Sequence, residues 1–294
     1  MRIAIQGVLG SFHEIATRLY FVNNEIEIVQ CNTFNDLFDS LEFAKSDIGV
    51  VAIENTVAGS IIPNYALLKA SGLKVMGEVY LRIEQHLVGL PSQRIQDIKE
   101  IQSHPMAIQQ CHDYLNPLRR NGVKLIDSED TALSAKRIAE NKSEGIAAIS
   151  SALAADIYGL KILAKSIETN KRNYTRFLVV SNELTYKQHT ANKNINKATL
   201  SFKLPHEEGS LHSVLSILSF YKINLSKIQS LPVIGKEWEY MFYVDLVFNN
   251  YEKYRLSLDA IKPLTIDLTI LGEYEKSSRP SENKIDKNKT NKTV

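Results

Sequence analysis

The sequence predicts an α/β protein in which a two-lobed region of mainly parallel sheets precedes a smaller α+β unit. From position 1 to about 181, short β-branched runs alternate with amphipathic segments, a pattern typical of parallel sheets covered by helices. After position 198 the order becomes strand, helix, two strands, helix and strand. This order is that of a ferredoxin-like unit, βαββαβ.

In the first region, each expected strand is a short apolar run bounded by polar segments. Helix-start signals separate the runs: Ser11 and Glu14 predict a capping box, Thr33 precedes an apolar stripe, and Pro105 lies in a first helical turn. A break over 82–96 predicts two lobes, residues 1–80 with 175–181 and residues 81–174, because the last strand can return to the first lobe. The expected strands are 2–5, 27–30, 48–52, 74–80, 100–102, 124–126, 145–149 and 176–180.

The second region begins after a change in composition. Residues 182–197 are rich in Asn, Lys, Gln and Thr and are predicted to form a linker. The unit expected over 198–274 has strands at 199–204, 224–232, 238–248 and 264–271, with helices at 210–221 and 251–261. The polar, Lys-rich segment 275–294 cannot bury apolar area and is predicted to be a disordered tail.

Composition excludes several classes of function. The chain has 294 residues, of which 44% are hydrophobic and 23% charged, with a net charge of +2, so we expect about two globular domains. No cluster of Lys and Arg with interleaved aromatics predicts nucleic-acid binding. No apolar run approaches the roughly 18 residues of a membrane span and no leader follows Met1, which predicts a cytoplasmic protein. Cys31 and Cys111 lack metal-ligand spacing and are expected to be buried thiols, so no metal site is predicted.

Three strand-to-helix junctions carry compact polar motifs. The first, Gly7–Phe12, offers free backbone N–H groups to an anion, but a plain tight turn with Ser11 as N-cap is the favoured explanation. The second follows the apolar run ending at Ile53 and packs Glu54, Asn55 and Ser60 together. Ligands of open α/β sheets collect at the carboxyl ends of strands, so this second junction favours a functional site.

The third junction is Ser103-His104-Pro105, with Gln110 on the helix that follows. Ser103 and the first-turn N–H groups are suited to hold a carboxylate. His104 is either a base or an ordinary cap residue, and the second explanation is favoured. Glu129 begins a later helix, where an acidic residue can simply offset the helix dipole.

A fourth motif, Asn173-Tyr174-Thr175-Arg176-Phe177, opens an apolar strand. It places a hydroxyl beside a guanidinium that is always charged, which predicts an anion pocket containing one hydroxyl donor. These four motifs, in this order and spacing, resemble the catalytic region of prephenate dehydratase over essentially residues 1–181. The segments 208–211 and 223–228 resemble the ACT regulatory domain appended to that enzyme.

The resemblance implies a periplasmic-binding-protein-like catalytic region that turns prephenate into phenylpyruvate without a cofactor, and a homodimer or homotetramer inhibited by phenylalanine. With no helical chorismate mutase domain before Met1, it implies the monofunctional form. Two departures are His13, where the family often has Ser or Thr, and Gln229 with Leu231, which replace charged residues and put the phenylalanine response in question. The implied residues are catalytic Thr175, Glu54, Asn55 and Gln110; substrate-binding Ser11, Ser60, Ser103, Arg176, Phe177 and Glu129; and effector-binding Gly209, Ser210, Leu211 and Asn224.

In the expected mechanism, Thr175 donates a hydrogen bond to the departing hydroxyl, while Arg176 and helix N-termini attract the two substrate carboxylates. Glu54 is either protonated by burial or oriented away from the substrate to position Asn55 or Arg176, and orientation is favoured. Two alternatives stay open. One is arogenate dehydratase, which accepts an amine where prephenate has a keto group. The other is a non-catalytic amino-acid sensor, which would have no need of the Thr175 hydroxyl.

Overall fold

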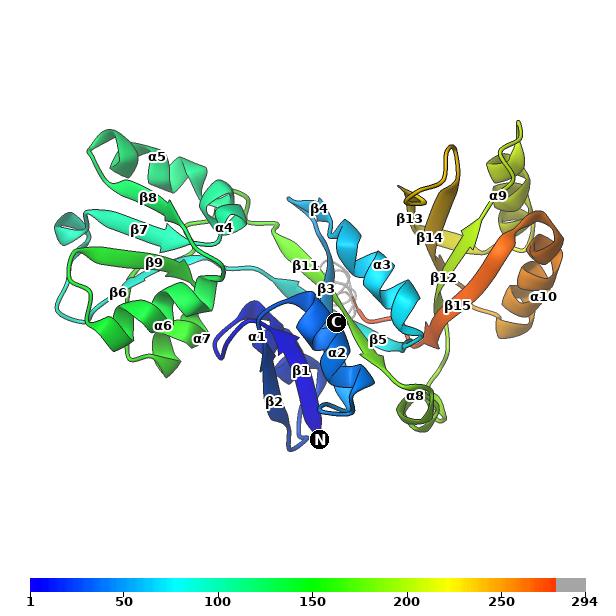
Figure 1. The fold of residues 1–294 in the computed structure, drawn as a ribbon, viewed down its shortest axis with the longest axis horizontal. Coiled ribbons are helices and arrows are strands. Elements are labelled where there is room, and N and C mark those ends of the chain that lie inside the picture. The colour runs from blue at the N-terminus through cyan, green and yellow to red at the C-terminus, as the bar shows by residue number, and fades with distance from the viewer. Residues whose placement is uncertain (279–294) are drawn as a thin grey trace, which may run out of the picture. The chain divides into compact units, whose positions relative to one another are not determined.

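The structure is a computed structural model that describes residues 1–278, and it confirms an α/β fold (Figure 1). Contacts between Cα atoms divide these residues into two compact units. The first comprises Met1–Ile61 and Val79–Phe177, and the second comprises Ile62–Glu78 and Leu178–Ser278. Two strands, β5 (Lys74–Arg82) and β11 (Tyr174–Ser181), cross from one unit into the other. The boundaries expected from sequence stay predictions.

The first sheet has the strand order β2-β1-β3-β11-β5, with β4 paired to β3. Strand β1 pairs in parallel with both β2 and β3, as the alternating pattern predicts. Its apolar middle, Ile3, Ala4 and Ile5, is completely buried. Strand β11 lies between β3 and β5, so the last strand of the two-lobed region does return to the first sheet. The remaining bounds here are β1 (Arg2–Gln6), α1 (Phe12–Tyr20), β2 (Glu27–Cys31), α2 (Phe34–Glu42), β3 (Ile48–Asn55) and β4 (Gly59–Ser60).

Helices α1 and α2 begin at the capping residues expected from the sequence. Thr33 forms a complete capping box, because its hydroxyl accepts from Asp36 N and the Asp36 carboxylate accepts from Thr33 N. Ser11 caps α1 by accepting from Glu14 N. The reciprocal half of that predicted box is absent, since the Glu14 carboxylate accepts from Gly10 N at 2.6 Å instead. Glu14 thus fixes the loop before the helix.

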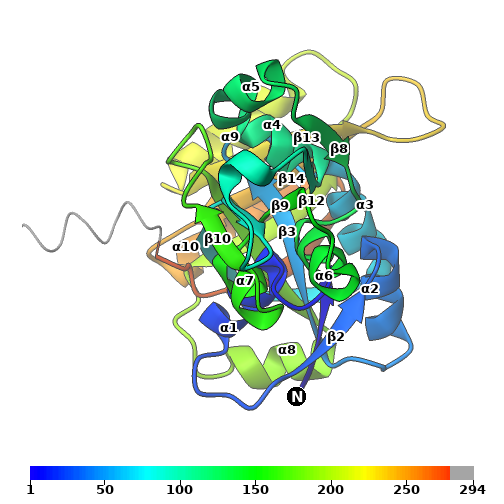
Figure 2. The ribbon, with the colours of Figure 1, turned by 90° about the vertical axis from the view of Figure 1, so that its left-hand side faces the viewer.

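The second sheet, of order β10-β6-β9-β7-β8, is mixed. Strand β7 pairs in parallel with β8 and β9, whereas β6 pairs antiparallel with β9 and β10. Figures 1 and 2 show α4 and α5 on one face of this sheet and α6 and α7 on the other. Buried residues alternate accordingly, with Ala147 and Ile149 in one core and Ala148 in the other. The bounds are β6 (His86–Gly89), β7 (Glu100–Ser103), α4 (Pro105–Gln110), α5 (His112–Arg120), β8 (Lys124–Asp127), α6 (Thr131–Asn141), β9 (Ile146–Ser150), α7 (Ala152–Ile157) and β10 (Lys161–Ala164).

The C-terminal part of the second unit has the predicted order βαββαβ, with strands arranged β13-β14-β12-β15 and every neighbouring pair antiparallel. Its core is formed by Leu200, Phe202, Val214, Leu246 and Tyr254. A helix, α8 (Glu183–Thr190), lies within the segment predicted as a linker. The other bounds are α3 (Ile62–Ser71), β12 (Lys197–Lys203), α9 (Ser210–Phe220), β13 (Asn224–Pro232), β14 (Tyr240–Val247), α10 (Tyr251–Ile261) and β15 (Ile266–Tyr274).

The second unit also contains a buried ion pair. The Lys197 ammonium group lies 2.9 and 2.7 Å from the two carboxylate oxygens of Glu78, and both residues are at most 2% exposed. Two residues after Lys197, Thr199 donates to the Asp245 carboxylate at 2.7 Å and contacts the Tyr274 hydroxyl. Charges this deeply buried require partners, which Glu78 and Lys197 supply to each other.

Cys31 and Cys111 are both buried free thiols, as predicted. Within residues 1–278, no helix has the length and apolar character required to cross a bilayer. The predicted disordered tail begins at 275, and its residues 279–294 lie outside the described part of the chain.

Candidate active site

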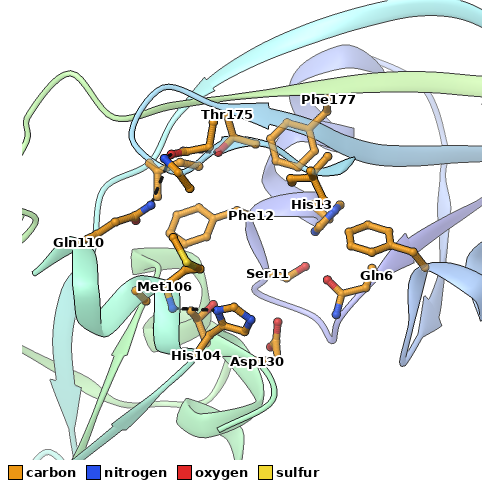
Figure 3. A pocket seen from close by; sticks show the side chains of 18 of the residues that line it. Gln6, Ser11, Phe12, His13, His104, Met106, Gln110, Asp130, Thr175 and Phe177 are labelled. Atoms are coloured by element: carbon orange, nitrogen blue, oxygen red, sulfur yellow. Dashed lines mark hydrogen bonds between the residues drawn. The ribbon is translucent and has the colours of Figure 1, made fainter. Parts of the chain in front are cut away.

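The first unit contains a cavity of about 460 Å³ (Figure 3). Strand ends and helix starts border it, as expected for an open α/β sheet. Besides the predicted positions, the cavity is lined by Gln6, His13, His104 and Asp130. The predicted site residues that line the cavity are Ser11, Asn55, Gln110, Glu129, Thr175 and Phe177.

A network of amides surrounds the Thr175 hydroxyl. Asn55, at the end of β3, donates through its Nδ2 to Thr175 Oγ1 at 2.9 Å and to Asn173 Oδ1 at 2.7 Å. The Asn55 Oδ1 accepts from the backbone N–H groups of Val57 and Ala58 at 2.9 and 2.8 Å. The Asn55 side chain is thereby held from both ends, so its orientation is determined by the turn that follows β3.

Gln110 on α4 extends this network across the cavity. Its Oε1 accepts from Asn173 Nδ2 at 2.9 Å, while its Nε2 lies 3.5 Å from Asn55 Oδ1. Gln85 Nε2 also lies 3.5 Å from Gln110 Oε1. Three of these residues were expected from the motifs, whereas Gln85 was not singled out by the sequence.

The direction of the Asn55 hydrogen bond determines what Thr175 can do. An amide N–H can only donate, so the Thr175 oxygen is the acceptor in that contact. The hydroxyl proton of Thr175 is then available to a group in the cavity. Thr175 is 8% exposed, which means that a ligand contacting it would be largely removed from water.

Arg176 does not line the cavity. Thr175 and Phe177 do, and successive side chains of a strand point to opposite faces, so Arg176 of β11 faces the other side of the sheet. There its guanidinium lies 3.9 Å from the carboxylate of Glu54, the β3 residue just before Asn55. Glu54 likewise does not line the cavity, and its position is compatible with the predicted orienting role.

Ser60 and Ser103 are also outside the cavity lining. Ser60 lies in β4 and pairs with Glu54 of β3. Ser103 is completely buried at the end of β7, where its hydroxyl donates to the backbone carbonyl of Ile149 at 2.7 Å. The helix start expected at Ser103 lies one residue later, because His104 is the N-cap of α4.

His104 is a helix cap and Glu129 is an exposed acidic residue before a helix, the simpler of the explanations given for each. The Nδ1 atom of His104 accepts from Met106 N at 3.2 Å, which is the work of a cap residue, while the ring still borders the cavity. Glu129 forms an exposed ion pair with Arg137 at 2.8 Å, and this contact lowers the pKa of its carboxyl. Asp130, the next residue, caps α6 by accepting from Leu133 N at 2.8 Å. Its place at the helix start was visible in the sequence, but its place in the cavity was not.

The loop that carries Ser11 is anchored to the two ends of α7. The Ser151 hydroxyl donates to Gly10 O at 2.6 Å, and the Tyr158 hydroxyl donates to Leu9 O at 2.8 Å. Gly10 has φ +86°, and a Cβ atom there would lie 2.6 Å from the Cα of Ala154. Glycine is required at this position because both the backbone conformation and the close approach exclude a side chain.

His13 is a cavity residue that the motif analysis noted only as a departure. Its ring packs edge-on against Phe177 with centroids 5.0 Å apart, and also against Phe34 at 5.6 Å. Its Nε2 is buried without a hydrogen-bond partner among the described residues. Burial lowers the pKa of His13 to about 3, so the imidazole is neutral at physiological pH.

This burial predicts a pH dependence of stability. Between about pH 6.5 and pH 3 the unfolded chain binds a proton on His13 that the folded protein does not, so stability from this group is present above pH 6.5 and is lost as the pH falls. The free energy of unfolding should fall by at most about 1.4 kcal/mol per pH unit from His13. Urea titrations at several pH values would compare the protein with His13→Phe, which keeps the aromatic packing. Parallel pH profiles for the two proteins would contradict the assignment.

The predicted effector residues lie in the second unit and border two separate hollows. Gly209, with φ +80°, is the N-cap of α9, and Ser210 and Leu211 line a hollow of about 150 Å³. Asn224 lines another hollow, of about 480 Å³, together with residues of α9 and β13. The structure therefore does not bring all four residues to one hollow.

Comparison with known proteins identifies the family. The model of the family described as prephenate dehydratase matches residues 3–185, which include the first two sheets and every motif of the cavity. The chain belongs to the prephenate dehydratase family. The Thr175 motif and the Asn55 junction both lie within the matched residues.

Relatives named for this activity cover most of the chain. The "Prephenate dehydratase" of Methanocaldococcus jannaschii is 33% identical over 90% of this chain and 94% of its own length. "Arogenate dehydratase/prephenate dehydratase 1, chloroplastic" of Arabidopsis thaliana is 36% identical over 83% of this chain, which spans only 64% of that relative. A crystal structure of prephenate dehydratase from Arthrobacter aurescens in complex with L-Phe has a TM-score of 0.83 and 25% identity, covering 96% of this chain and 91% of its own.

Proposed function

We propose that the protein is a carbon–oxygen lyase that converts prephenate to phenylpyruvate, the step that forms the aromatic ring in phenylalanine biosynthesis. The observation that carries the proposal is the Thr175 hydroxyl, which accepts from Asn55 and therefore directs its own proton to the cavity. Membership of the prephenate dehydratase family supports the choice of substrate.

The reaction breaks two bonds of prephenate. Loss of the ring carboxylate as CO2 leaves its electron pair to form a ring double bond, and the C–O bond to the ring hydroxyl breaks as the ring becomes aromatic. Negative charge develops on the departing oxygen, where Thr175 donates its hydrogen bond. Aromatisation supplies much of the driving force, so neither a strong acid nor a cofactor is needed.

Backbone groups supply positive potential for the substrate carboxylates. Helices α1, α2 and α6 begin at the cavity, where residues of their first turns are part of the lining. The N–H groups of helix N-termini attract anions. Arg176 adds a nearby buried positive charge from the opposite face of its strand, and Glu54 orients it. The proposed roles of Ser60 and Ser103 are likewise indirect, through the strands that hold the cavity.

The assay that tests the function is incubation of purified protein with prephenate, followed by measurement of phenylpyruvate. Parallel incubation with arogenate, followed by measurement of phenylalanine, tests the first alternative, which the name of the Arabidopsis relative favours. Binding of these compounds without turnover of either would overturn the proposal and favour the amino-acid sensor. We further propose that the enzyme acts in the cytoplasm.

We also propose that the βαββαβ unit is an ACT domain that binds phenylalanine and inhibits the enzyme as a homodimer or homotetramer. The L-Phe complex of the Arthrobacter aurescens enzyme supports this. The N-terminus of α9, beginning at Ser210 after Gly209, offers N–H groups to an amino-acid carboxylate. The strand β14 residues 241–246 alternate and have the apolar content needed to pair with a second copy.

Phenylalanine is expected to bind and to inhibit, although Gln229 and Leu231 replace the charged residues that the family has on β13. The reason is that the backbone groups at Gly209 and Ser210 do not depend on those side chains. Calorimetry with phenylalanine, paired with prephenate turnover at the same concentrations, measures both effects. Heat of binding accompanied by an unaltered rate would show that the missing charges couple the two sites.

A further inference from the structure

Asp130 places a carboxylate on the side of the cavity opposite Thr175 (Figure 3). One of its oxygens, Oδ1, accepts from Leu133 N and caps α6, so the side chain has a defined direction. Room for the other oxygen depends on Gly7, because a Cβ atom at Gly7 would lie 3.0 Å from Asp130 Oδ2. The cap of α6 therefore fixes the carboxylate at the cavity wall, and Gly7 leaves the space that it occupies.

The charges at this wall are acidic. Among the described residues that line the cavity, none is Lys or Arg, and the acidic ones are Glu129 and Asp130. Glu129 is exposed and is already paired with Arg137. Asp130 is more buried, and this burial raises the pKa of its carboxyl despite several backbone hydrogen bonds. A cation that approached Asp130 would meet an anion that is partly shielded from solvent.

We propose that Asp130 is a specificity-determining residue whose carboxylate pairs with an ammonium group on the side chain of the substrate, so that the cavity accepts arogenate. This inference rests on the proposed function. Arogenate and prephenate share the ring, its leaving hydroxyl and both carboxylates, and they differ only in having an amine or a keto group. The side chain is attached at the ring carbon opposite the hydroxyl. A substrate whose hydroxyl meets Thr175 therefore extends its side chain toward Asp130.

The two substrates respond differently to a carboxylate at this wall. The ammonium of arogenate donates hydrogen bonds to Asp130, and a charge-assisted bond of this kind is roughly twice as strong as a neutral one. A keto oxygen can only accept, so prephenate gains no hydrogen bond from an ionised Asp130 and places the partial negative charge of its keto oxygen near it. The ion pair between Asp130 and the ammonium group thus favours arogenate over prephenate without any contact to the reacting hydroxyl.

Asp130→Asn separates these effects because asparagine also caps helices but carries no charge. We expect kcat/KM for arogenate to fall by about tenfold or more, as typical for loss of a hydrogen bond to a charged group. The value for prephenate should stay the same or rise. Both substrates are assayed with the unmodified protein, with Asp130→Asn and with Glu140→Gln, which removes an equal charge from an exposed position on α6 that is paired with Lys136 and lies outside the cavity lining.

A fall confined to arogenate and to Asp130→Asn would support the proposal. Equal losses for both substrates would show a structural role for Asp130, and unchanged values for both would show that the carboxylate does not contact the side chain; either result overturns it. Measurable turnover of prephenate with none of arogenate in the unmodified protein would also overturn it, while leaving the dehydratase function intact. Failure of the proposed function itself is recognised separately, because then neither substrate reacts.

Discussion

Replacement of Thr175 by alanine is expected to lower kcat for prephenate by about a hundredfold or more, with little change in KM. That is the effect typical of removing one positioned proton-transfer or oxyanion partner. The hydroxyl is held by Asn55 at 2.9 Å and is 8% exposed, so water is poorly placed to replace it. Because the interaction with the departing oxygen develops only in the transition state, its loss should appear in kcat.

Two further variants distinguish chemistry from packing. Thr175→Ser keeps the hydroxyl and should retain much more activity than Thr175→Ala. Thr175→Val keeps the volume but loses the hydroxyl, so it should be as impaired as the alanine variant. Steady-state rates of phenylpyruvate formation provide the comparison. If the valine variant turned over prephenate at a rate close to that of the unmodified protein, Thr175 would not be the hydrogen-bond donor to the leaving group.

The largest expected effect on stability comes from Lys197. Its ammonium group lies between both carboxylate oxygens of Glu78, and each residue is at most 2% exposed. Lys197→Met leaves the Glu78 carboxylate buried without its counter-ion, which in other proteins costs about 3–5 kcal/mol. We therefore expect the free energy of unfolding, measured in urea by circular dichroism, to fall by this order.

The double variant Lys197→Met with Glu78→Met is the matched control. Two apolar side chains of similar size restore a buried contact without charges, and such replacements are often neutral or stabilising. The double variant should therefore be more stable than the single one. A single variant that lost less than about 1 kcal/mol, the upper range for exposed ion pairs, would show that water reaches the pair after the substitution.

The local signals of the sequence predicted most elements of both units. Strand β13 has its predicted bounds of 224 and 232, and α10 has its predicted bounds of 251 and 261. Apolar alternation and helix-start residues determine such elements locally. Strands β6 and β10 were not predicted, and β6 lies in the stretch interpreted as a break between lobes. Strand β6 is stabilised by pairing with β9, and β10 by pairing with β6. A short window of sequence does not contain these pairing partners.

The motifs predicted which segments meet at the site, because each motif lies at the end of a predicted strand or on the helix that follows one. Asn55 and Thr175 stand at strand ends, and Gln110 lies on a helix that begins at another, so their convergence follows from sheet topology. The sequence analysis predicted Thr175 and Arg176 in one anion pocket, although neighbouring side chains of a strand point to opposite faces. Only the tertiary structure decided that Thr175 faces the cavity and Arg176 faces Glu54.

Tertiary structure likewise decided the roles of Asp130 and His13. In the sequence Asp130 is one of two acidic residues before a helix, and its carboxylate belongs to the cavity only because Gly7, far away in the chain, leaves space for it. His13 is a departure from a pattern until Phe34 and Phe177 enclose its ring. The surroundings of Asp130 and His13 thus depend on residues more than a hundred positions away in the chain. The motifs indicate which segments form the site, whereas tertiary packing determines what each side chain contacts there.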